Sequence, residues 1–218
     1  MYTCIHSERI KLMYRQLALL FLITISAIGS SIEIGSNEIP KNIPFCGSCA
    51  LSLRYQTLYL EGEIGGAINI QSISLMRTPQ GESHVTLDTL AIYMGYSSGA
   101  ELGNNFNDNY LAGSRLLVFW EENCTINAPN ANEWFQINLE TPFFYDGTGN
   151  LIIEYTWPSG HDAIYNYNWT GTVARGLPGP WGATTGYTEQ DCPHILLSGI
   201  LSLQNETFGK IKALFSTY

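Results

Sequence analysis

The chain has 218 residues, of which 45% are hydrophobic and 13% are charged, and its formal net charge at pH 7 is −9. This length predicts one or at most two domains. An acidic surface repels a phosphate backbone, so the composition argues against nucleic acid as a partner.

Residues 1–29 have the features of a cleavable secretory signal. A basic stretch comes first, and its charges are Arg9, Lys11 and Arg15. An apolar run of about twelve residues, LALLFLITISAI, follows at 17–28, and it is shorter than the roughly twenty residues of a membrane-spanning helix. Ala27 and Gly29 are placed for cleavage before Ser30, with cleavage after Ser31 as an alternative. We predict a signal peptide over 1–29, with Met13 as an alternative start, and a secreted or cell-surface protein without a membrane span after cleavage.

Cleavage changes both the charge and the cysteine content. It removes three basic residues and one acidic residue, which takes the formal charge from −9 to −11. It leaves four of the five cysteines: Cys46, Cys49, Cys124 and Cys192. An even number of cysteines in an oxidising compartment predicts disulfides, and we favour a long-range Cys124–Cys192 pair with a local Cys46–Cys49 pair. The CGSC sequence at 46–49 also fits a redox motif or half of a zinc site.

The rest of the chain predicts short strands. Residues 30–44 are polar with two prolines, and predict a mobile leader or an added edge strand. From Phe45 onward, β-prone runs alternate with Gly, Asn, Asp and Pro. The predicted strands are Leu51–Tyr59, Ile68–Met76, Thr86–Met94, Leu116–Phe119, Trp134–Asn138, Leu151–Trp157, Ala163–Trp169 and Ile195–Leu203. After the signal, helical periodicity is confined to Phe208–Phe215.

Two local patterns complete the fold prediction. The apolar positions in Ala67–Leu75 change register, which predicts a β-bulge near Gln71. Four glycines and two prolines in Gly176–Gly186 predict a long surface loop that carries Trp181. Short strands with almost no helix predict an all-β fold, a two-sheet β-sandwich of jelly-roll-like type over residues 45–203, followed by a tail at 204–218.

A series of motifs carries a resemblance to a known family. In order they are IPF, QTLYLEGEIGGAINIQSISL, TLAIYMGYSS, LLVFW, EWFQINLETPFFYDGTGNLIIEYTW and CPHILLSG. Together they span roughly residues 43–199 and resemble a β-sandwich module of exported bacterial proteins, found in multidomain surface proteins with type IX secretion sorting tails. TPFFYDGTGNLII is the most specific string. The resemblance implies a non-catalytic module that is secreted or lies at the cell surface.

Candidate catalytic groups are sparse. Glu61 and Glu63 are two residues apart in a strand-like run, and we expect a solvated edge before the Gly65-Gly66 turn. The pair Glu121-Glu122 is predicted to lie in a strand-end loop. The histidines that follow the signal are far apart in the sequence: His84, His161 and His194. We therefore predict no catalytic residue and no enzymatic activity.

We predict no cofactor, although one loop offers candidate ligands for calcium. Asn105, Asn107 and Asp108 lie with Asn104 and Asn109 in an oxygen-rich loop, and Ca²⁺ takes six to eight oxygen ligands. The alternative is a polar turn whose Asn side chains bond their own backbone.

Aromatic residues supply the other candidate site. Six of them fall close together in sequence: Trp157, Tyr165, Tyr167, Trp169, Trp181 and Tyr187. The spacing of two puts the first three after Trp157 on one face of a strand, either the core face or a platform for a sugar or protein.

These observations predict a structural, adhesive or filament-forming module whose partners are other copies of itself or surface glycans and proteins. The alternative function is carbohydrate binding through exposed Trp and Tyr.

Overall fold

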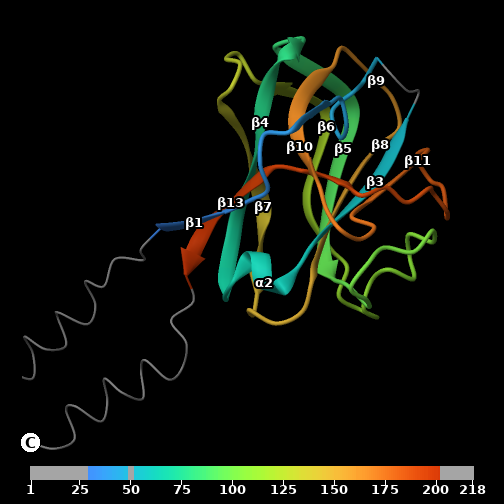
Figure 1. Cartoon of the computed structure of the whole chain (residues 1–218). Helices are drawn as coiled ribbons and strands as arrows, with labels where there is room; N and C mark the ends of the chain where they lie inside the picture. Colours follow the sequence, from blue (N-terminus) through green and yellow to red (C-terminus); the bar gives the residue numbers. More distant parts are fainter. Residues whose placement is uncertain (1–28, 49–51, 202–218) are drawn as a thin grey trace, which may run out of the picture.

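The computed structural model describes residues 29–48 and 52–201, which form two antiparallel β-sheets packed as a sandwich (Figure 1). The all-β prediction is confirmed. The seven-stranded sheet comprises β1 (Gly29–Ile34), β2 (Ile39–Lys41), β4 (Ile68–Gly81), β7 (Trp134–Tyr145), β10 (Ile164–Thr170), β12 (Asp191–Pro193) and β13 (Ile195–Leu201). The six-stranded sheet comprises β3 (Leu53–Tyr59), β5 (His84–Tyr96), β6 (Leu116–Asn127), β8 (Leu151–Trp157), β9 (Gly160–His161) and β11 (Gly176–Gly179).

The main core lies between the two sheets. Side chains alternate along each strand, so Tyr55 and Tyr59 of β3 point inward with Tyr155 of β8, and all three are fully buried. Phe45 packs edge-on against Tyr155, with ring centroids 5.7 Å apart. Burial of these large aromatic side chains supplies much of the hydrophobic stabilisation of the fold.

The order of strands in each sheet shows which strands lie at an edge. The six-stranded sheet runs β11–β3–β8–β5–β6, and the other runs β1–β13–β4–β10–β12, with β7 also paired to β4. β6 and β7 are therefore edge strands, one in each sheet. Both extend beyond their predicted ends, since Glu121 and Glu122 lie within β6 and Pro142 lies within β7. An edge strand tolerates charges and proline because one of its sides faces solvent.

The predicted bulge at Gln71 is confirmed in the pairings of β4 with β7 and with β13. Ile70 pairs with Phe143 of β7 and Ser72 with Asn138, so Gln71 has no partner there. The same residue is skipped opposite β13. The extra residue moves the inward positions from Ile68 and Ile70 to Ile73 and Leu75, all fully buried.

The polar leader belongs to the sandwich, as its edge-strand alternative predicts. β1 pairs with β13, and β2 pairs with β10. Ile34 at the end of β1 is buried against the main core. The buried His194 holds the same segment, because its Nε2 lies 2.9 Å from Glu33 Oε1 and its Nδ1 lies 2.7 Å from Asn37 Oδ1.

Two local predictions need correction. Glu61–Ile64 forms one helical turn, α2, instead of a strand edge, because Glu63 accepts a hydrogen bond from the Leu60 amide and Gly65 ends the turn at a φ of 77°. Gly176–Gly179, the start of the predicted surface loop, forms β11 at the sheet edge beside β3. Pro178 has no backbone N–H to donate, and an edge strand tolerates this.

Several predictions fall outside the described residues: positions 1–28 of the signal, Cys49, and the C-terminal segment with its expected helix at 208–215. Within 29–48 and 52–201, no helix has the length and apolar character needed to cross a membrane.

We predict that Ile34→Ala lowers the free energy of unfolding by about 2–4 kcal/mol, because the truncation leaves a cavity under β1. Urea unfolding followed by circular dichroism measures the change. Ser31→Ala, at an exposed position of the same strand, is the control. Equal midpoints for the two variants would contradict the docked leader.

Candidate functional site

The structure separates the two cysteines that the sequence predicts as a long-range pair. Cys124 lies in β6 and Cys192 in β12, which belong to different sheets, and both are buried free thiols. The Cys192 thiol donates a weak hydrogen bond to the Leu58 carbonyl, with a sulfur–oxygen distance of 3.8 Å. The Cys124–Cys192 prediction is therefore wrong. The Cys46–Cys49 pairing stays a prediction because Cys49 lies outside the described residues.

The six predicted aromatic contacts do not form one platform. Trp157 is buried in the main core and its Nε1 donates to the Pro44 carbonyl at 3.0 Å, so its assignment as a surface contact is wrong. Tyr165, Tyr167 and Trp169 share one face of β10 and are each half-buried.

The last two of the six are well exposed. Trp181 is 56% and Tyr187 64% exposed, and both follow β11 of the other sheet. Trp181 lies in the long loop that the sequence predicts, beyond the short strand that opens it.

The Asn-rich loop does not fit calcium. The Oδ1 atom of Asn105 accepts from the Asn107 amide at 3.0 Å, which is the local turn that the alternative predicts. The Oδ1 atom of Asn107 accepts from Arg54 Nη2 at 3.0 Å. A guanidinium already bonded to this oxygen would repel a divalent cation. Within the described ranges, no group of three His, Cys, Asp or Glu side chains could hold a metal.

The histidines and helix-turn carboxylates are used within the protein. His84 and His161 both reach Oδ2 of Asp162, at 3.3 and 2.8 Å, so these two are neighbours in space although the sequence separates them. The carboxylate of Glu63 pairs with Arg175, whereas Glu61 accepts from the Gly149 amide. Glu61 and Glu63 therefore do not face one another.

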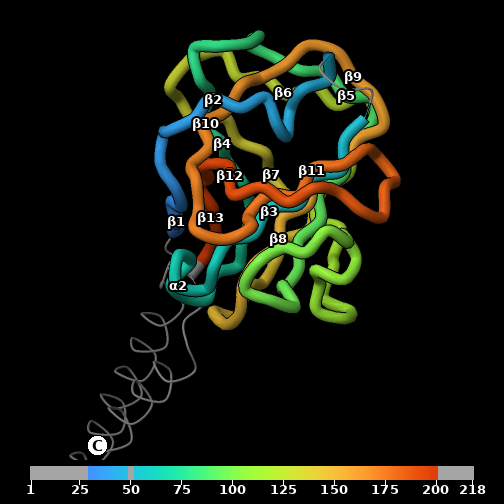
Figure 2. The backbone as a smooth tube through the Cα atoms, turned by 45° about the vertical axis from the view of Figure 1, so that its right-hand side comes forward, coloured from blue at the N-terminus to red at the C-terminus, as the bar shows by residue number. Residues whose placement is uncertain are grey.

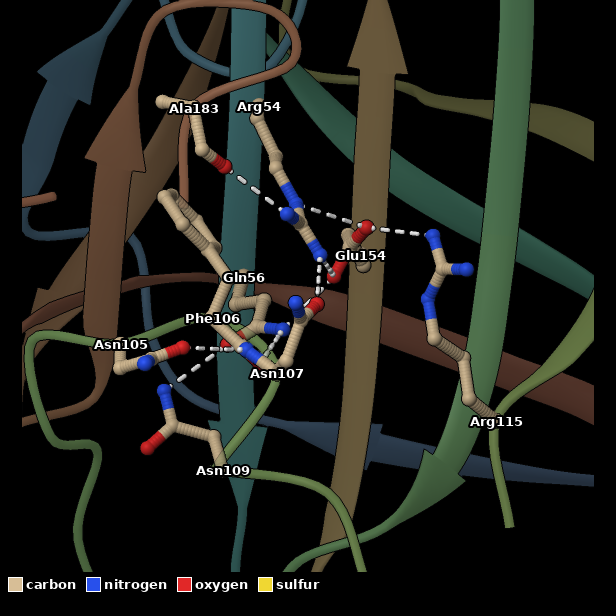
Figure 3. Close-up of polar contacts among 9 residues, drawn as sticks. All are labelled: Arg54, Gln56, Asn105, Phe106, Asn107, Asn109, Arg115, Glu154 and Ala183. Atoms are coloured by element: carbon tan, nitrogen blue, oxygen red, sulfur yellow. Dashed lines mark hydrogen bonds and ion pairs between the residues drawn. The ribbon is translucent and has the colours of Figure 1, made fainter. Parts of the chain in front are cut away.

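Four polar side chains gather on the outer face of the six-stranded sheet (Figure 3): Arg54, Gln56, Arg115 and Glu154. We call them the Glu154 cluster. Their neighbours Tyr55 and Tyr155 point into the main core, so Arg54, Gln56 and Glu154 point the other way. The register aligns Gln56 with Glu154 across β3 and β8.

Glu154 is fully buried and both of its oxygens are saturated. Its Oε1 accepts from Arg54 Nε at 3.1 Å and from Arg115 Nη2 at 2.8 Å. Its Oε2 accepts from Arg54 Nη2 at 3.2 Å and from Gln56 Nε2 at 2.6 Å. Burial works against the charge of Arg115, but the carboxylate outweighs it and raises the pKa of that guanidinium. These contacts compensate the desolvation of the buried carboxylate.

The cluster also fastens two loops to the sheet. Gln56 Nε2 donates to the Phe106 carbonyl at 2.8 Å, and Asn109 donates to Gln56 Oε1 at 2.9 Å. These bonds hold the 97–115 loop, which lies beside β3 and β8 (Figure 2). A second apolar cluster forms beneath it from Leu58, Leu102, Phe106, Tyr110, Ile152 and Leu177. The loop thus covers the half of the outer face around Leu58 and Ile152, which we call the lower half.

The second loop presents Trp181 at the tip of a tight turn. The Ala183 amide donates to the Pro180 carbonyl at 3.0 Å, and Gly182 has a φ of 75°, as a type II turn requires. Arg54 Nη1 donates to the Ala183 carbonyl at 2.9 Å, and the Trp181 amide donates to Ser52 Oγ at 3.1 Å. The turn is therefore fixed over the start of β3.

The upper half of the same face is open. Cross-strand pairs place Arg54 opposite Thr156, Thr156 opposite Ala91, and Ala91 opposite Trp120. Trp120 on edge strand β6 is 44% exposed and Thr156 is half-buried, whereas Ala91 between them is 6% exposed. We call the surface formed by Thr156, Ala91, Trp120 and the Trp181 turn the open face.

Sequence reasoning missed most of this site. Trp120 lies just beyond the predicted end of its strand. Arg54, Gln56 and Glu154 are polar residues that alternate with apolar ones inside predicted strands, LRYQTLY and LIIEYTW. That alternation indicates a second, polar face of the sheet, although not that loops bury it.

Comparison with known proteins identified no matching family model, no similar curated protein and no similar solved structure. The assignment of the fold as a β-sandwich therefore rests on the two sheets of the structure itself.

We predict that Glu154→Gln lowers the free energy of unfolding by about 3 kcal/mol, because it leaves the buried Arg54 guanidinium without its counter-charge. Urea unfolding of this variant is compared with that of Glu122→Gln, an exposed carboxylate on β6. The prediction is wrong if the two variants unfold at the same urea concentration.

We predict that both buried thiols resist alkylation in the native state at pH 8. Burial raises the pKa of Cys124 and of Cys192 to about 12, whereas an unfolded thiol ionises near 8.5. The stability that these neutral thiols contribute is complete below pH 8.5 and is lost as the pH rises toward 12. Mass spectrometry should find both alkylated only after unfolding, without reductant. A requirement for reductant would indicate a disulfide at these cysteines.

Proposed function

We propose that this chain is an exported β-sandwich module that acts at the cell surface as an adhesive protein, by contact and not by catalysis. The proposal joins the predicted secretory signal and the surface-module resemblance of the sequence to the surface of the fold. The open face is the observation that carries it.

The distribution of polar and apolar groups supports contact over catalysis. Glu154 is the fully buried carboxylate of the site, and its four N–H donors leave it no role as an acid or base. By contrast, Trp120 and Trp181 leave about half of their surface to solvent. Exposed tryptophan on a rigid sheet or a fixed turn is a common anchor of binding surfaces.

The leader supports the adhesive form over a filament built by exchange of N-terminal strands. β1 is already paired along its whole length with β13 of the same chain, from Gly29 to Ile34. A neighbouring copy that supplied this strand would have to displace Ile34 from the core. Contact through the folded surface needs no such rearrangement.

Carbohydrate binding is the second candidate function, and the position of the two tryptophans favours it. They flank one sheet face that carries hydroxyl and guanidinium groups between them. Flat aromatic rings beside such donors match the mixed character of a sugar, with its apolar C–H face and polar rim.

The first test is location and surface binding in the organism that produces the protein. We expect an antibody against the sandwich to label intact cells, and the labelled mature protein to bind those cells saturably. Detection of the protein inside cells alone, with no labelling of intact cells, would overturn the proposal.

A further inference from the structure

One half of the outer sheet face is closed and the other half is open. In the closed half, Ile152 and Leu58 are fully buried under the 97–115 loop. In the open half, Thr156 of the central strand β8 keeps partial exposure. The boundary between the halves is the Glu154 cluster.

The open half has a tryptophan residue at each flank. Trp120 belongs to edge strand β6, and Trp181 is held beside the start of β3 by its amide bond to Ser52. Three inter-strand steps separate β3 from β6, which is about 14 Å at the usual strand spacing. Small side chains, Thr156 and Ala91, lie between. This span suits an oligosaccharide better than a single sugar.

Arg115 adds a preorganised donor at the border of this surface. Its Nη2 is bonded to Glu154, its guanidinium carbon lies 3.4 Å from the centre of the Tyr93 ring, and its side chain is 36% exposed. Glu154 accepts from Arg115, and the rings of Tyr93 and Tyr110 lie beside the guanidinium. The other N–H groups of Arg115 can donate to a ligand at little entropic cost, because the side chain is already fixed.

The surroundings of the tryptophans argue for a glycan as occupant. Arg54 and Arg115 border the open face, and guanidinium N–H groups are donors that suit the hydroxyls of a sugar. A nucleic acid could stack on the same rings, but the formal charge of the chain is −9 and opposes phosphate. The C–H bonds of a pyranose ring carry partial positive charge, which the negative face of an indole attracts.

We propose that the open face binds a polysaccharide, with sugar rings stacked on Trp120 and Trp181 and a hydroxyl or carboxylate bonded to Arg115. The inference rests on the proposed adhesive function and names the chemistry of its partner. In this arrangement Arg54 and Glu154 are positioning residues, since Arg54 holds the Trp181 turn through the Ala183 carbonyl and Glu154 orients both arginines.

The test is a glycan array carrying neutral β-glucans, xylans and uronate polymers, probed with the mature protein. We expect binding to one of these classes, and calorimetry with that polymer should show it weakened about tenfold or more by Trp120→Ala or by Trp181→Ala. Tyr187→Ala removes an exposed aromatic outside the open face and should leave affinity unchanged. Circular dichroism checks that all three variants fold.

The arms of the experiment also separate neutral from acidic ligands. Loss of binding in Arg115→Lys to uronate polymers alone identifies a carboxylate contact, because lysine keeps the charge but not the planar pair of donors. Equal loss for neutral polymers identifies a hydroxyl contact.

Two results would overturn the inference. One is no binding to any glycan on the array, and the other is glycan binding that both tryptophan variants retain. If these variants still bind intact producing cells as the unaltered protein does, the adhesive function stands and the glycan site fails. Absence of cell binding by the unaltered protein counts against the adhesive function itself.

Discussion

Glu154 has no contact with solvent, although it points away from the main core of the sandwich. A carboxylate can be buried there only because two arginines and a glutamine supply four N–H donors to it. Arg54 and Gln56 also donate to the carbonyls of Ala183 and Phe106, which lie in two loops. Compensation of one buried charge therefore decides where the 97–115 loop and the Trp181 turn lie, and so how much of the sheet face remains open.

This constraint links fold and function physically. The 97–115 loop covers the lower half of the outer face and creates a second apolar cluster around Phe106 and Tyr110. The Trp181 turn lies at the border of the upper half, because Arg54 bonds the Ala183 carbonyl and Ser52 bonds the Trp181 amide at the start of β3. A rigid surface with fixed aromatic groups loses little conformational entropy on binding, which favours recognition by contact.

Much of the fold follows from alternation along the chain. The pattern LIIEYTW predicts β8 with its observed ends, and the change of register around Gln71 predicts the bulge in β4. Prediction fails where pairing outweighs local composition. The polar segment EENCTIN continues β6 because β5 pairs with all of it except Asn123, and GLPG forms β11 because β3 offers an edge. No local signal reports such partners.

The sequence by itself determined the all-β class, the alternation that builds the core and the candidate aromatic residues. The sequence also grouped Trp157 with Trp181, because proximity along the chain was the reason for grouping the aromatic residues. Only the tertiary structure separated them, burying Trp157 between the sheets and exposing Trp181 on a turn. It likewise separated Cys124 from Cys192 and brought Trp120 into line with Arg54 across four strands. Neighbours across a sheet depend on strand order and register, and these are set by long-range packing that no local pattern encodes.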